Sequence, residues 1–347
     1  MSKVASELFD IMVEKDCRQL TFHYDPATGM KAILAVDSLP DPAAGYDAKV
    51  SGGTRLAHDN ADDALADAMN LAKAMTRKCK VLQSTDGGGK SVVVYDKVKN
   101  ENFIKAIGRF IENQRGLFST GVDMNLTLDD AELIASQTQY ITSLRSNYGS
   151  TGENTAQGMF FAFRDNVERL ISKPLVDTSF AIQGIGAVGA ALVQRLVDAG
   201  VTDIRVCDIN DEATDELCKR YSSVKKIDNE DFLEQSVDIL CPCNKGGVIT
   251  TENVQQLQCK VLAPASNNTL TDEAAITEWM GQQNITYIPD FVLNSGGYLQ
   301  AICERKNTGL ETARAKTIVI SHAVAKLLDL HEENNKTLWQ NAVEIYR

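Results

Sequence analysis

The stretch Phe180-Ala-Ile-Gln-Gly184-Ile-Gly186-Ala-Val-Gly189 decides the fold of the second half of this chain. Its apolar start predicts a short buried strand, and the small and apolar residues of 187–199 predict a helix directly after it. Gly184 allows a tight turn, Gly186 lets a pyrophosphate approach the backbone, and Gly189 permits close contact of helix and sheet. The stretch therefore predicts a dinucleotide site at a helix N-terminus.

An acidic residue follows the next predicted strand, Ile204–Cys207. Asp208 would accept hydrogen bonds from ribose hydroxyls and repel a 2′-phosphate, which favours NAD over NADP. Arg205 favours NADP, but it lies inside the predicted strand. The alternative is a tight strand-to-helix turn that binds no ligand. The predicted cofactor contacts in this unit are Gly184, Ile185, Gly186, Ala187, Val188, Gly189 and Asp208.

Strands and helices alternate after this unit, which is typical of a doubly wound parallel sheet. The earlier residues read as a mixed α/β unit, with a strand at 91–95 leaving a glycine loop. We expect two α/β domains with a cleft between them: a substrate-binding and oligomerisation domain at 1–149 and a Rossmann-type domain at 150–327. The C-terminal helix at about 328–347 is a candidate to pack back on the first domain.

Composition restricts the possible partners. The 347 residues carry 47 acidic and 35 basic side chains, a net charge of −12, without a basic block. This balance argues against nucleic acid and anionic membranes as partners. No apolar run approaches ~20 residues and no signal-peptide pattern begins the chain, so we expect a cytoplasmic protein. The eight cysteines lack zinc or redox spacing, and no metal site is expected.

A second motif, Gly87-Gly-Gly-Lys90, lies in the first half, twelve positions after Lys78. Two lysines held close lower each other's pKa, so one of them could act as a base near pH 7. A phosphate-binding loop is the competing interpretation, but Ser84 stands where that motif needs glycine and Asp86 would repel phosphate. Each lysine alone would also suit a solvated turn or a helix end.

Two neighbouring segments favour a functional role for Lys78 and Lys90. Ser51-Gly-Gly53-Thr-Arg55 offers a second glycine pair, and Thr120-Gly-Val-Asp123 places a carboxylate where a predicted strand ends. Ligand groups collect at strand ends in α/β domains. Two lysines and an aspartate could hold an acid substrate and move protons.

Together these blocks resemble the glutamate/leucine/phenylalanine/valine dehydrogenases, which deaminate amino acids oxidatively, and most of all the leucine and phenylalanine branch. The resemblance covers nearly the whole chain, and the blocks come in the family's order. They are Gly52-Gly-Thr-Arg55, Met75-Thr-Arg-Lys78, Gly87-Gly-Gly-Lys90, Thr120-Gly-Val-Asp123, Gln183-Gly-Ile-Gly-Ala-Val-Gly189, Cys241-Pro-Cys243, Ala265-Ser-Asn-Asn268 and Pro289-Asp-Phe-Val-Leu-Asn294-Ser-Gly-Gly297.

The resemblance implies roles for single residues. Lys78 would bind the substrate carboxylate, Lys90 would activate water, and Asp123 would move protons at the amino nitrogen. Hydride would pass from the substrate Cα to NAD, leaving a 2-oxo acid and ammonia, in a homo-oligomer whose domains close to exclude water. Gly53 and Asn268 would fix the substrate, and the nicotinamide end would be lined by Thr155, Cys243, Asn244, Asn267 and Asn294.

The resemblance also implies a side-chain pocket of Ser51, Gly121, Tyr298 and Ala301. Ser51 replaces the lysine of the glutamate enzymes, which disfavours glutamate and favours a branched-chain or aromatic amino acid. This chain departs from the family pattern at Gln83-Ser-Thr-Asp86, Thr151-Gly-Glu-Asn154, Pro264 and Ser266. Two alternatives stay open: a catalytically altered dinucleotide-binding protein, and an imine or amine oxidoreductase of a biosynthetic pathway.

Overall fold

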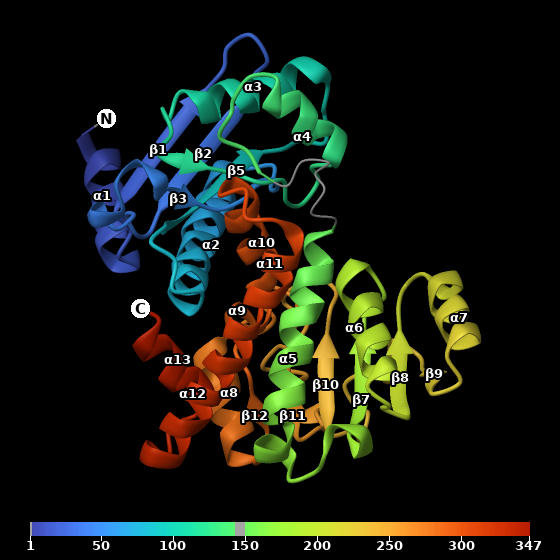
Figure 1. The fold of residues 1–347 in the computed structure, drawn as a ribbon. Helices are drawn as coiled ribbons and strands as arrows, with labels where there is room; N and C mark the ends of the chain where they lie inside the picture. The colour runs from blue at the N-terminus through green and yellow to red at the C-terminus, as the bar shows by residue number, and fades with distance from the viewer. Residues whose placement is uncertain (1, 143–149) are drawn as a thin grey trace. The chain divides into compact units, whose positions relative to one another are not determined.

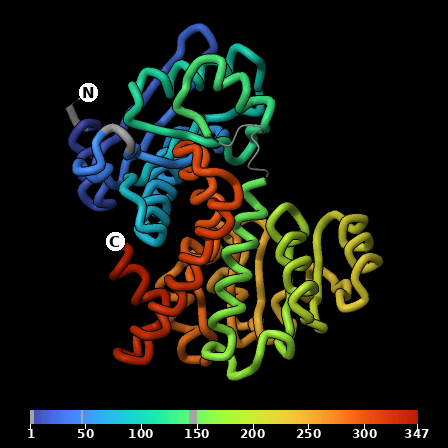
Figure 2. The backbone as a smooth tube through the Cα atoms, viewed as in Figure 1, coloured from blue at the N-terminus to red at the C-terminus, as the bar shows by residue number. Residues whose placement is uncertain are grey.

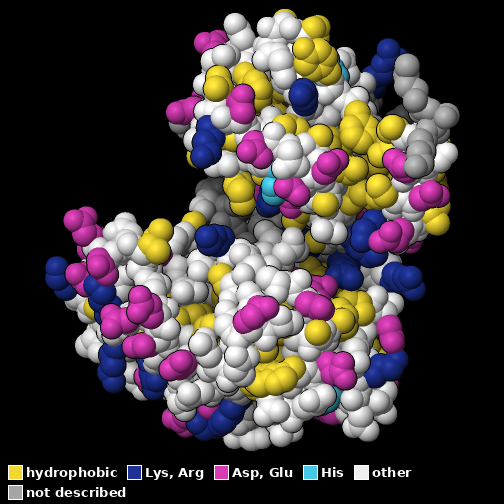
Figure 3. Space-filling view, turned by 180° about the vertical axis from the view of Figure 1, so that it is seen from behind, with side chains coloured by type: hydrophobic (Ala, Val, Ile, Leu, Met, Phe, Trp, Pro, Cys, Tyr) yellow, Lys and Arg dark blue, Asp and Glu magenta, His cyan; other side chains and the backbone are white. Residues whose placement is uncertain are grey.

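The computed structural model describes residues 2–142 and 150–347 (Figure 1). The chain divides into two compact units, one of residues 1–147 with Arg347 and one of residues 148–346. Lys/Arg and Asp/Glu side chains are interspersed on the face seen in Figure 3. Within the described ranges, no helix is long and apolar enough to cross a membrane.

The first unit is built on a six-stranded mixed sheet of order β1-β2-β5-β3-β6, with β4 paired to β5. β1, β2 and β5 run antiparallel, whereas β3 and β4 run parallel to β5 and β6 runs parallel to β3. The strands are β1 (Gln19–Tyr24), β2 (Lys31–Val36), β3 (Val50–Ser51), β4 (Thr54–Leu56), β5 (Gly87–Val94) and β6 (Phe118–Ser119).

Helices cover both faces of this sheet. Apolar residues of α2 pack with Ile33, Ala35 and Val92 on one face, and those of α3 pack with Leu34 and Val93 on the other. The alternation of side chains along β2 and β5 produces these two separate cores. The helical segments are α1 (Ser2–Lys15), η1 (Pro42–Asp47), α2 (Ala61–Val81), α3 (Glu101–Glu112) and α4 (Leu128–Ala135).

The glycine motif differs from its prediction. Gly87–Gly89 do not form a loop but begin β5, and Lys90 lies inside that strand. The glycines are needed because neighbouring segments come very close. A Cβ at Gly88 would overlap the Thr76 backbone of α2, and one at Gly87 would overlap the Ser38 carbonyl oxygen. Close packing rather than turn geometry therefore explains the three glycines.

The second unit contains a parallel sheet of order β12-β11-β10-β7-β8-β9. Counted along the chain, this is the doubly wound order that binds dinucleotides, and it confirms the predicted fold class. β9 was not predicted; its second and third residues are exposed lysines, which hide the strand pattern. The strands are β7 (Ser179–Gln183), β8 (Asp203–Cys207), β9 (Val224–Lys226), β10 (Ile239–Pro242), β11 (Val261–Leu262) and β12 (Thr286–Tyr287).

Helices α5 and α6 lie side by side over one face of this sheet (Figure 1). The red C-terminal segment lies beside the orange segment that carries α8 and β12, and α13 contacts β12 (Figure 2). The helical segments are α5 (Thr151–Ile171), η2 (Leu175–Asp177), α6 (Ala187–Asp198), α7 (Asp211–Arg220), η3 (Val254–Gln256), α8 (Glu273–Gln282), α9 (Asp290–Leu293), α10 (Gly296–Arg305), α11 (Leu310–Lys316), α12 (Ile318–Asn334) and α13 (Leu338–Ile345).

The C-terminal region differs from its prediction. Thr317 separates two helices, α11 and α12, before the last helix α13. The second unit also extends past residue 327 to Tyr346, and residues 328–346 belong to it. Leu338 and Ala342 of α13 are buried, so this amphipathic helix finds apolar contacts within the second unit.

Candidate active site

Strand pairing in the first unit brings the predicted residues of the amino acid half-site together. β3 and β4 pair with β5 in one register, which places Ser51 opposite Gly88 and Gly53 beside Lys90. Side chains alternate between the two faces of a strand. Val92, two positions after Lys90, packs in the α2 core, so Lys90 lies on the face that α2 covers.

The segment after β6 adds the carboxylate. β6 pairs with β3 so that Ser51 lies opposite Ser119. Beyond β6, the Thr54 N–H donates to the Gly121 carbonyl at 2.9 Å, and the Asp123 N–H donates to the Thr54 carbonyl at 3.0 Å. These backbone bonds continue the strand-like pairing and hold Asp123 beside the glycine pair.

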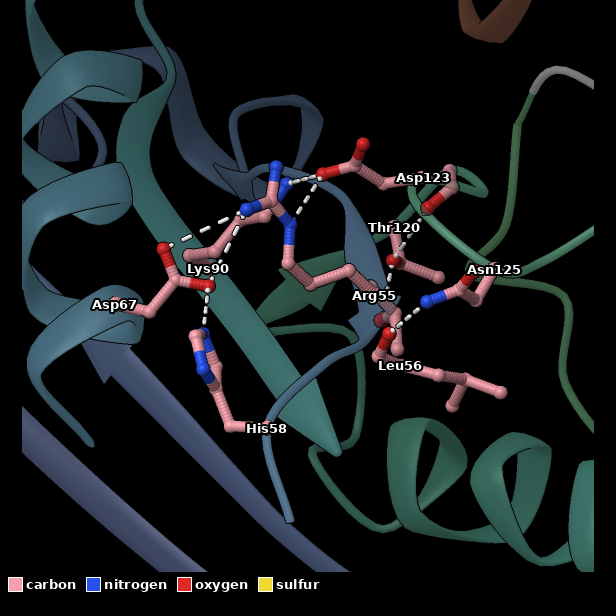
Figure 4. A network of polar contacts seen from close by, with 10 residues as sticks. Arg55, Leu56, His58, Asp67, Lys90, Thr120, Asp123 and Asn125 are labelled. Atoms are coloured by element: carbon pink, nitrogen blue, oxygen red, sulfur yellow. Dashed lines mark hydrogen bonds and ion pairs between the residues drawn. The ribbon is translucent and has the colours of Figure 1, made fainter. Parts of the chain in front are cut away.

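The buried Lys90 forms an ion pair through Nζ with Oδ2 of the partly exposed Asp123 (Figure 4). Arg55 Nε donates to the same Asp123 oxygen at 3.0 Å. The other carboxylate oxygen, Oδ1, points away from both cations (Figure 4). One oxygen of Asp123 is thus held by two positive charges, while the other is available to a ligand.

The network continues outward from Arg55. Arg55 Nη1 lies 3.2 Å from Asp67 Oδ2 and 3.5 Å from Asp67 Oδ1. His58 Nε2 lies 3.2 Å from Asp67 Oδ2 (Figure 4). Asp67 comes from α2, whose buried face packs on the sheet. The guanidinium of Arg55 is therefore fixed from both sides, and this fixes its contact with Asp123.

The electrostatics of this network suit proton transfer. Burial lowers the pKa of Lys90; Asp123 opposes that shift, whereas Arg55 adds to it. Burial alone would raise the pKa of Asp123, but the charges of Lys90 and Arg55 outweigh it and hold this pKa well below its usual range. The result is an amine that loses its proton more readily than an ordinary lysine, next to a carboxylate that stays ionised.

The glycine pair of the first unit leaves room at this centre. A Cβ at Gly53 would lie 2.9 Å from Lys90 Nζ and 3.2 Å from the Asp123 Cβ. A Cβ at Gly52 would overlap the Gly89 carbonyl oxygen. Any side chain at Gly53 would push against the Lys90 amine, so the glycine keeps the space beside Lys90 clear.

Lys78, the predicted carboxylate ligand, lies in the last turn of α2 and is buried. The next residue, Cys79, contacts the Gly87 carbonyl through its sulfur at 3.6 Å. This contact ties the end of α2 to the start of β5. Of the residues predicted for the substrate, the first unit thus holds Lys78 together with Ser51, Gly53, Lys90, Gly121 and Asp123.

In the second unit, the glycine motif has the geometry that a pyrophosphate needs. Gly184 has a φ of 94°, and its N–H donates to the Cys207 carbonyl at 2.8 Å. A Cβ at Gly189 would overlap the Gly184 carbonyl oxygen. A Cβ at Gly186 would meet no atom of the described chain within 4 Å, so a ligand can approach the start of α6, which carries Ala187 and Val188.

Asp208 directly follows β8 and faces the glycine turn. Its Oδ2 accepts from the Ile185 N–H at 2.5 Å, and its Oδ1 accepts from the Asn210 N–H at 2.8 Å. Arg205 donates instead to Gln235 at 3.0 Å and to Asp203 at 3.3 Å. The acid therefore lies at the turn, while the arginine is held by other side chains of the same unit.

The residues predicted for the nicotinamide end also have unused polar atoms. Asn244 donates through Nδ2 to Gln183 Oε1 at 2.8 Å, and Asn294 donates through Nδ2 to Asn267 Oδ1 at 3.1 Å. The buried Oδ1 atoms of Asn244 and Asn294 have no hydrogen-bond partner among the described residues. Such carbonyl oxygens are suitable acceptors for a carboxamide NH₂. The side chains thus fit a bound nicotinamide.

Five further predicted residues lie in the same unit. The Cys243 N–H donates to the Gln183 carbonyl at 2.7 Å, and burial raises the pKa of its thiol to about 12. Thr155 lies near the start of α5, and its hydroxyl donates to the carbonyl of Thr151, the first residue of that helix, at 3.1 Å. Tyr298 and Ala301 lie on α10, and Asn268 has a left-handed φ of 51° beside Asn267.

Several residues of the first half-site were not predicted from the sequence. Arg55 lies in a quoted motif but was assigned no role, and Asp67, His58 and Ser119 were not predicted as site residues. The signal for Arg55 was its spacing, because a residue two positions after Gly53 on an extended segment reaches the same face. The other three residues reach the half-site through helix packing and strand pairing, and neither produces a recognisable pattern in the nearby sequence.

Comparisons with known proteins agree with this architecture. The family model Glutamate/Leucine/Phenylalanine/Valine dehydrogenase matches residues 149–344, and the dimerisation-domain model Glu/Leu/Phe/Val dehydrogenase matches residues 47–143. Leucine dehydrogenase of Bacillus subtilis is 32% identical over 94% of this chain and 90% of its own. Phenylalanine dehydrogenase of Lysinibacillus sphaericus is 31% identical over 90% of this chain and 82% of its own.

A solved structure supports the same assignment. L-tryptophan dehydrogenase from Nostoc punctiforme matches with a TM-score of 0.82 and 27% identity, covering 97% of both chains. The predicted family is thus confirmed, and with it an oxidoreductase of amino acids that has a domain for a nicotinamide cofactor. This chain belongs to the Glutamate/Leucine/Phenylalanine/Valine dehydrogenase family.

Proposed function

We propose that this protein is an NAD-dependent dehydrogenase that converts an L-amino acid with a branched-chain or aromatic side chain, reversibly, into its 2-oxo acid and ammonia. The observation that carries the proposal is the Lys90–Asp123 pair, in which a buried amine and an ionised carboxylate share one ion-pair network with Arg55. The names of the similar leucine, phenylalanine and tryptophan dehydrogenases support the substrate class.

The residues of the first unit have separate tasks in this proposal. Lys78 binds the substrate carboxylate, and Asp123 Oδ1 accepts a proton from the substrate amino group. The bound NAD supplies the hydride acceptor for the substrate Cα. Lys90, as the neutral amine, takes a proton from the water that adds to the imino carbon, and Asp123 returns a proton to the departing ammonia.

The second unit would hold the cofactor. The backbone around Gly184–Gly189 receives the pyrophosphate, and Asp208 accepts hydrogen bonds from the adenosine ribose. Asn244 and Asn294 offer buried carbonyl oxygens to the carboxamide. The preference for NAD rests on the position of Asp208 beside Ile185 and on the contacts that hold Arg205 elsewhere.

A reductive-amination screen tests the activity. The protein, ammonia and NADH are mixed with a panel of branched-chain and aromatic 2-oxo acids, and NADH absorbance is followed. We expect consumption of NADH with at least one of them. A folded protein that binds NADH but turns over no member of the panel would contradict the proposal and favour a sensor that binds the dinucleotide.

The cofactor preference has its own test. Asp208→Ser removes the charge that would repel a 2′-phosphate, so the ratio of kcat/KM for NADH over NADPH should fall by at least about tenfold. Asp203→Ser is the matched control, since Asp203 contacts Arg205 in the same strand but lies away from the glycine turn.

We also propose that the protein forms a homo-oligomer. The dimerisation domain named in the matching family model supports this proposal, and light scattering would test it.

A further inference from the structure

Three amide side chains follow the carboxyl ends of strands in the second unit and form a chain of hydrogen bonds. Asn229 lies after β9, Gln183 ends β7, and Asn244 lies after β10. Asn229 Nδ2 donates to the backbone carbonyl of Asp208 at 2.8 Å. Gln183 Nε2 donates to Asn229 Oδ1 at 3.4 Å, and Asn244 Nδ2 donates to Gln183 Oε1 at 2.8 Å. This amide chain of Asn229, Gln183 and Asn244 therefore runs from the end of β8 to the segment after β10.

The amide chain crosses the point where the strand order reverses. From β7, the sheet continues through β8 and β9 on one side and through β10, β11 and β12 on the other. Dinucleotides bind to such sheets outside the carboxyl ends of the strands at this point. Asp208 lies on the side proposed for the adenosine, and Asn244 lies on the side proposed for the nicotinamide. The amide chain thus connects the two halves of the proposed cofactor site.

The backbone carbonyl at one end determines the orientation of every amide in the chain. A carbonyl oxygen only accepts, so Asn229 must turn its NH₂ group to Asp208 and its oxygen to Gln183. Gln183 must then give its NH₂ group to Asn229 and its oxygen to Asn244. Turning any one amide over would set oxygen against oxygen or NH₂ against NH₂ at its contacts. Asn244 therefore spends its NH₂ group on Gln183.

The oxygen of Asn244 is the group that remains. Asn244 Oδ1 is buried and has no hydrogen-bond partner among the described residues. A buried acceptor without a donor costs free energy, and a carboxamide NH₂ would remove that cost, whereas a ketone in the same place would not. The amide chain thus determines not only where Asn244 lies but which chemical group of a ligand it favours.

We propose that Gln183 and Asn229 are positioning residues of the nicotinamide site, which hold Asn244 with its oxygen toward the carboxamide NH₂ of the cofactor. This role rests on the proposed function, in which Asn244 contacts the nicotinamide, and it adds the residues that orient the contact. Neither Gln183 nor Asn229 acts on the reacting atoms. Both act through the amide of Asn244.

The test compares two cofactors that differ in one group: NADH and its reduced 3-acetylpyridine analogue, in which a methyl group replaces the NH₂. The measured quantity is the Kd of the analogue divided by the Kd of NADH, from calorimetry. We expect a ratio of at least about tenfold for the wild type, because the analogue leaves the buried acceptor without a donor.

Two variants release Asn244 at different distances. Gln183→Leu removes its partner, and Asn229→Ala removes the group that orients this partner. Asn244 can then turn its NH₂ group to the ketone, so each variant should lower the ratio by at least about threefold. The double variant should match Gln183→Leu, because both changes break one chain of hydrogen bonds.

A ligand control and a variant control separate orientation from folding. ADP-ribose lacks the nicotinamide, and the Asp208 carboxylate is held by the N–H groups of Ile185 and Asn210 rather than by the amide chain. Its Kd should therefore stay within about twofold in both variants. Gln194→Leu is the matched control variant, since this amide of α6 donates to Asp198 at 2.8 Å and is not part of the amide chain. It should leave the ratio unchanged.

The outcomes separate the role of the amide chain from the proposed activity. A wild-type ratio near one, or a ratio that both variants leave unchanged, overturns the role while the dehydrogenase activity stands. Equal losses of affinity for ADP-ribose and NADH would also overturn it, because the residues would then support the adenosine end. If the ratios behave as expected but no 2-oxo acid is turned over, only the proposed activity fails. Asn229 is exposed, so Asn229→Ala decides alone if Gln183→Leu does not fold.

Discussion

Two carboxylates, one in each unit, each accept contacts from two cations, yet their surroundings differ. Asp123 binds Lys90 and Arg55, whose side chains are 7% and 12% exposed. Asp238 lies 3.0 Å from Lys173 and 2.9 Å from Lys260, whose side chains are 43% and 55% exposed. Asp238 also accepts from the N–H and hydroxyl of Ser179, at 3.0 and 3.1 Å.

The difference separates the proposed reactive centre from a structural ion-pair cluster. In both places the pKa of the carboxyl is lowered, because cations and donors outweigh the effect of burial. Beside Asp123 the ammonium group of Lys90 is buried, and this burial lowers the pKa of Lys90. Near Asp238 the lysines remain hydrated, and the carboxylate instead ties the start of β7 to the start of β10. A perturbed carboxyl alone therefore does not identify an active site.

The largest effect should come from the buried lysine. Lys90→Met should lower kcat for reductive amination by about 10³-fold, since a general base typically contributes 10²–10⁴-fold. NADH binding, followed by fluorescence titration, should remain. Lys260→Met is the control at the exposed site and should leave kcat within about twofold. Comparable losses in both variants would remove the distinction between the two carboxylates.

Replacing each of the two carboxylates should affect a different property of the protein, activity in one case and stability in the other. Asp123→Asn should lower kcat by about 10²-fold, whereas Asp238→Asn should lower the free energy of unfolding by about 2 kcal/mol, because a buried backbone N–H and two lysines lose a charged partner. Trp279 and Trp339 both lie in the second unit and report its unfolding in urea. Loss of activity in fully folded Asp238→Asn would contradict a purely structural role.

The pH dependence of the rate tests the Arg55 network. Arg55 lowers the pKa of Lys90 and Asp67 raises it. Arg55→Met should therefore shift the acidic limb of the kcat/KM profile to higher pH, and Asp67→Asn should shift it to lower pH. Shifts in the same direction would mean that both variants act by disordering the site rather than through charge.

The smallest effect concerns acid stability. The folded-state pKa of Asp238 is lowered relative to about 3.9 in an unfolded chain. Its contribution to stability is therefore complete above that value and is lost as the pH falls towards the folded-state pKa. The difference in unfolding free energy between wild type and Asp238→Asn should shrink between pH 7 and pH 3.5. A constant difference would exclude linkage to this carboxyl.

Local sequence patterns were sufficient for much of this protein. The apolar run before Gly184 and the acid after the next strand predicted β7, α6 and β8, because each pattern reports burial and backbone geometry within a few residues. The capping box of Thr127 and Asp130 at the start of α4 is a further local signal of the same kind. Lys90 and Asp123 were singled out from the glycines and strand ends around them.

Sequence alone thus determined the parallel-sheet unit and the family, and it was sufficient to propose Lys90 as the reactive lysine. Only the tertiary structure decided that Gly87–Gly89 belong to a strand, that Arg55 joins Asp123 to Asp67, and that Asp86 binds Ser51. Each of these contacts joins segments far apart in sequence. They depend on strand register and helix packing, which arise from the burial of whole faces and are therefore invisible in any short stretch of residues.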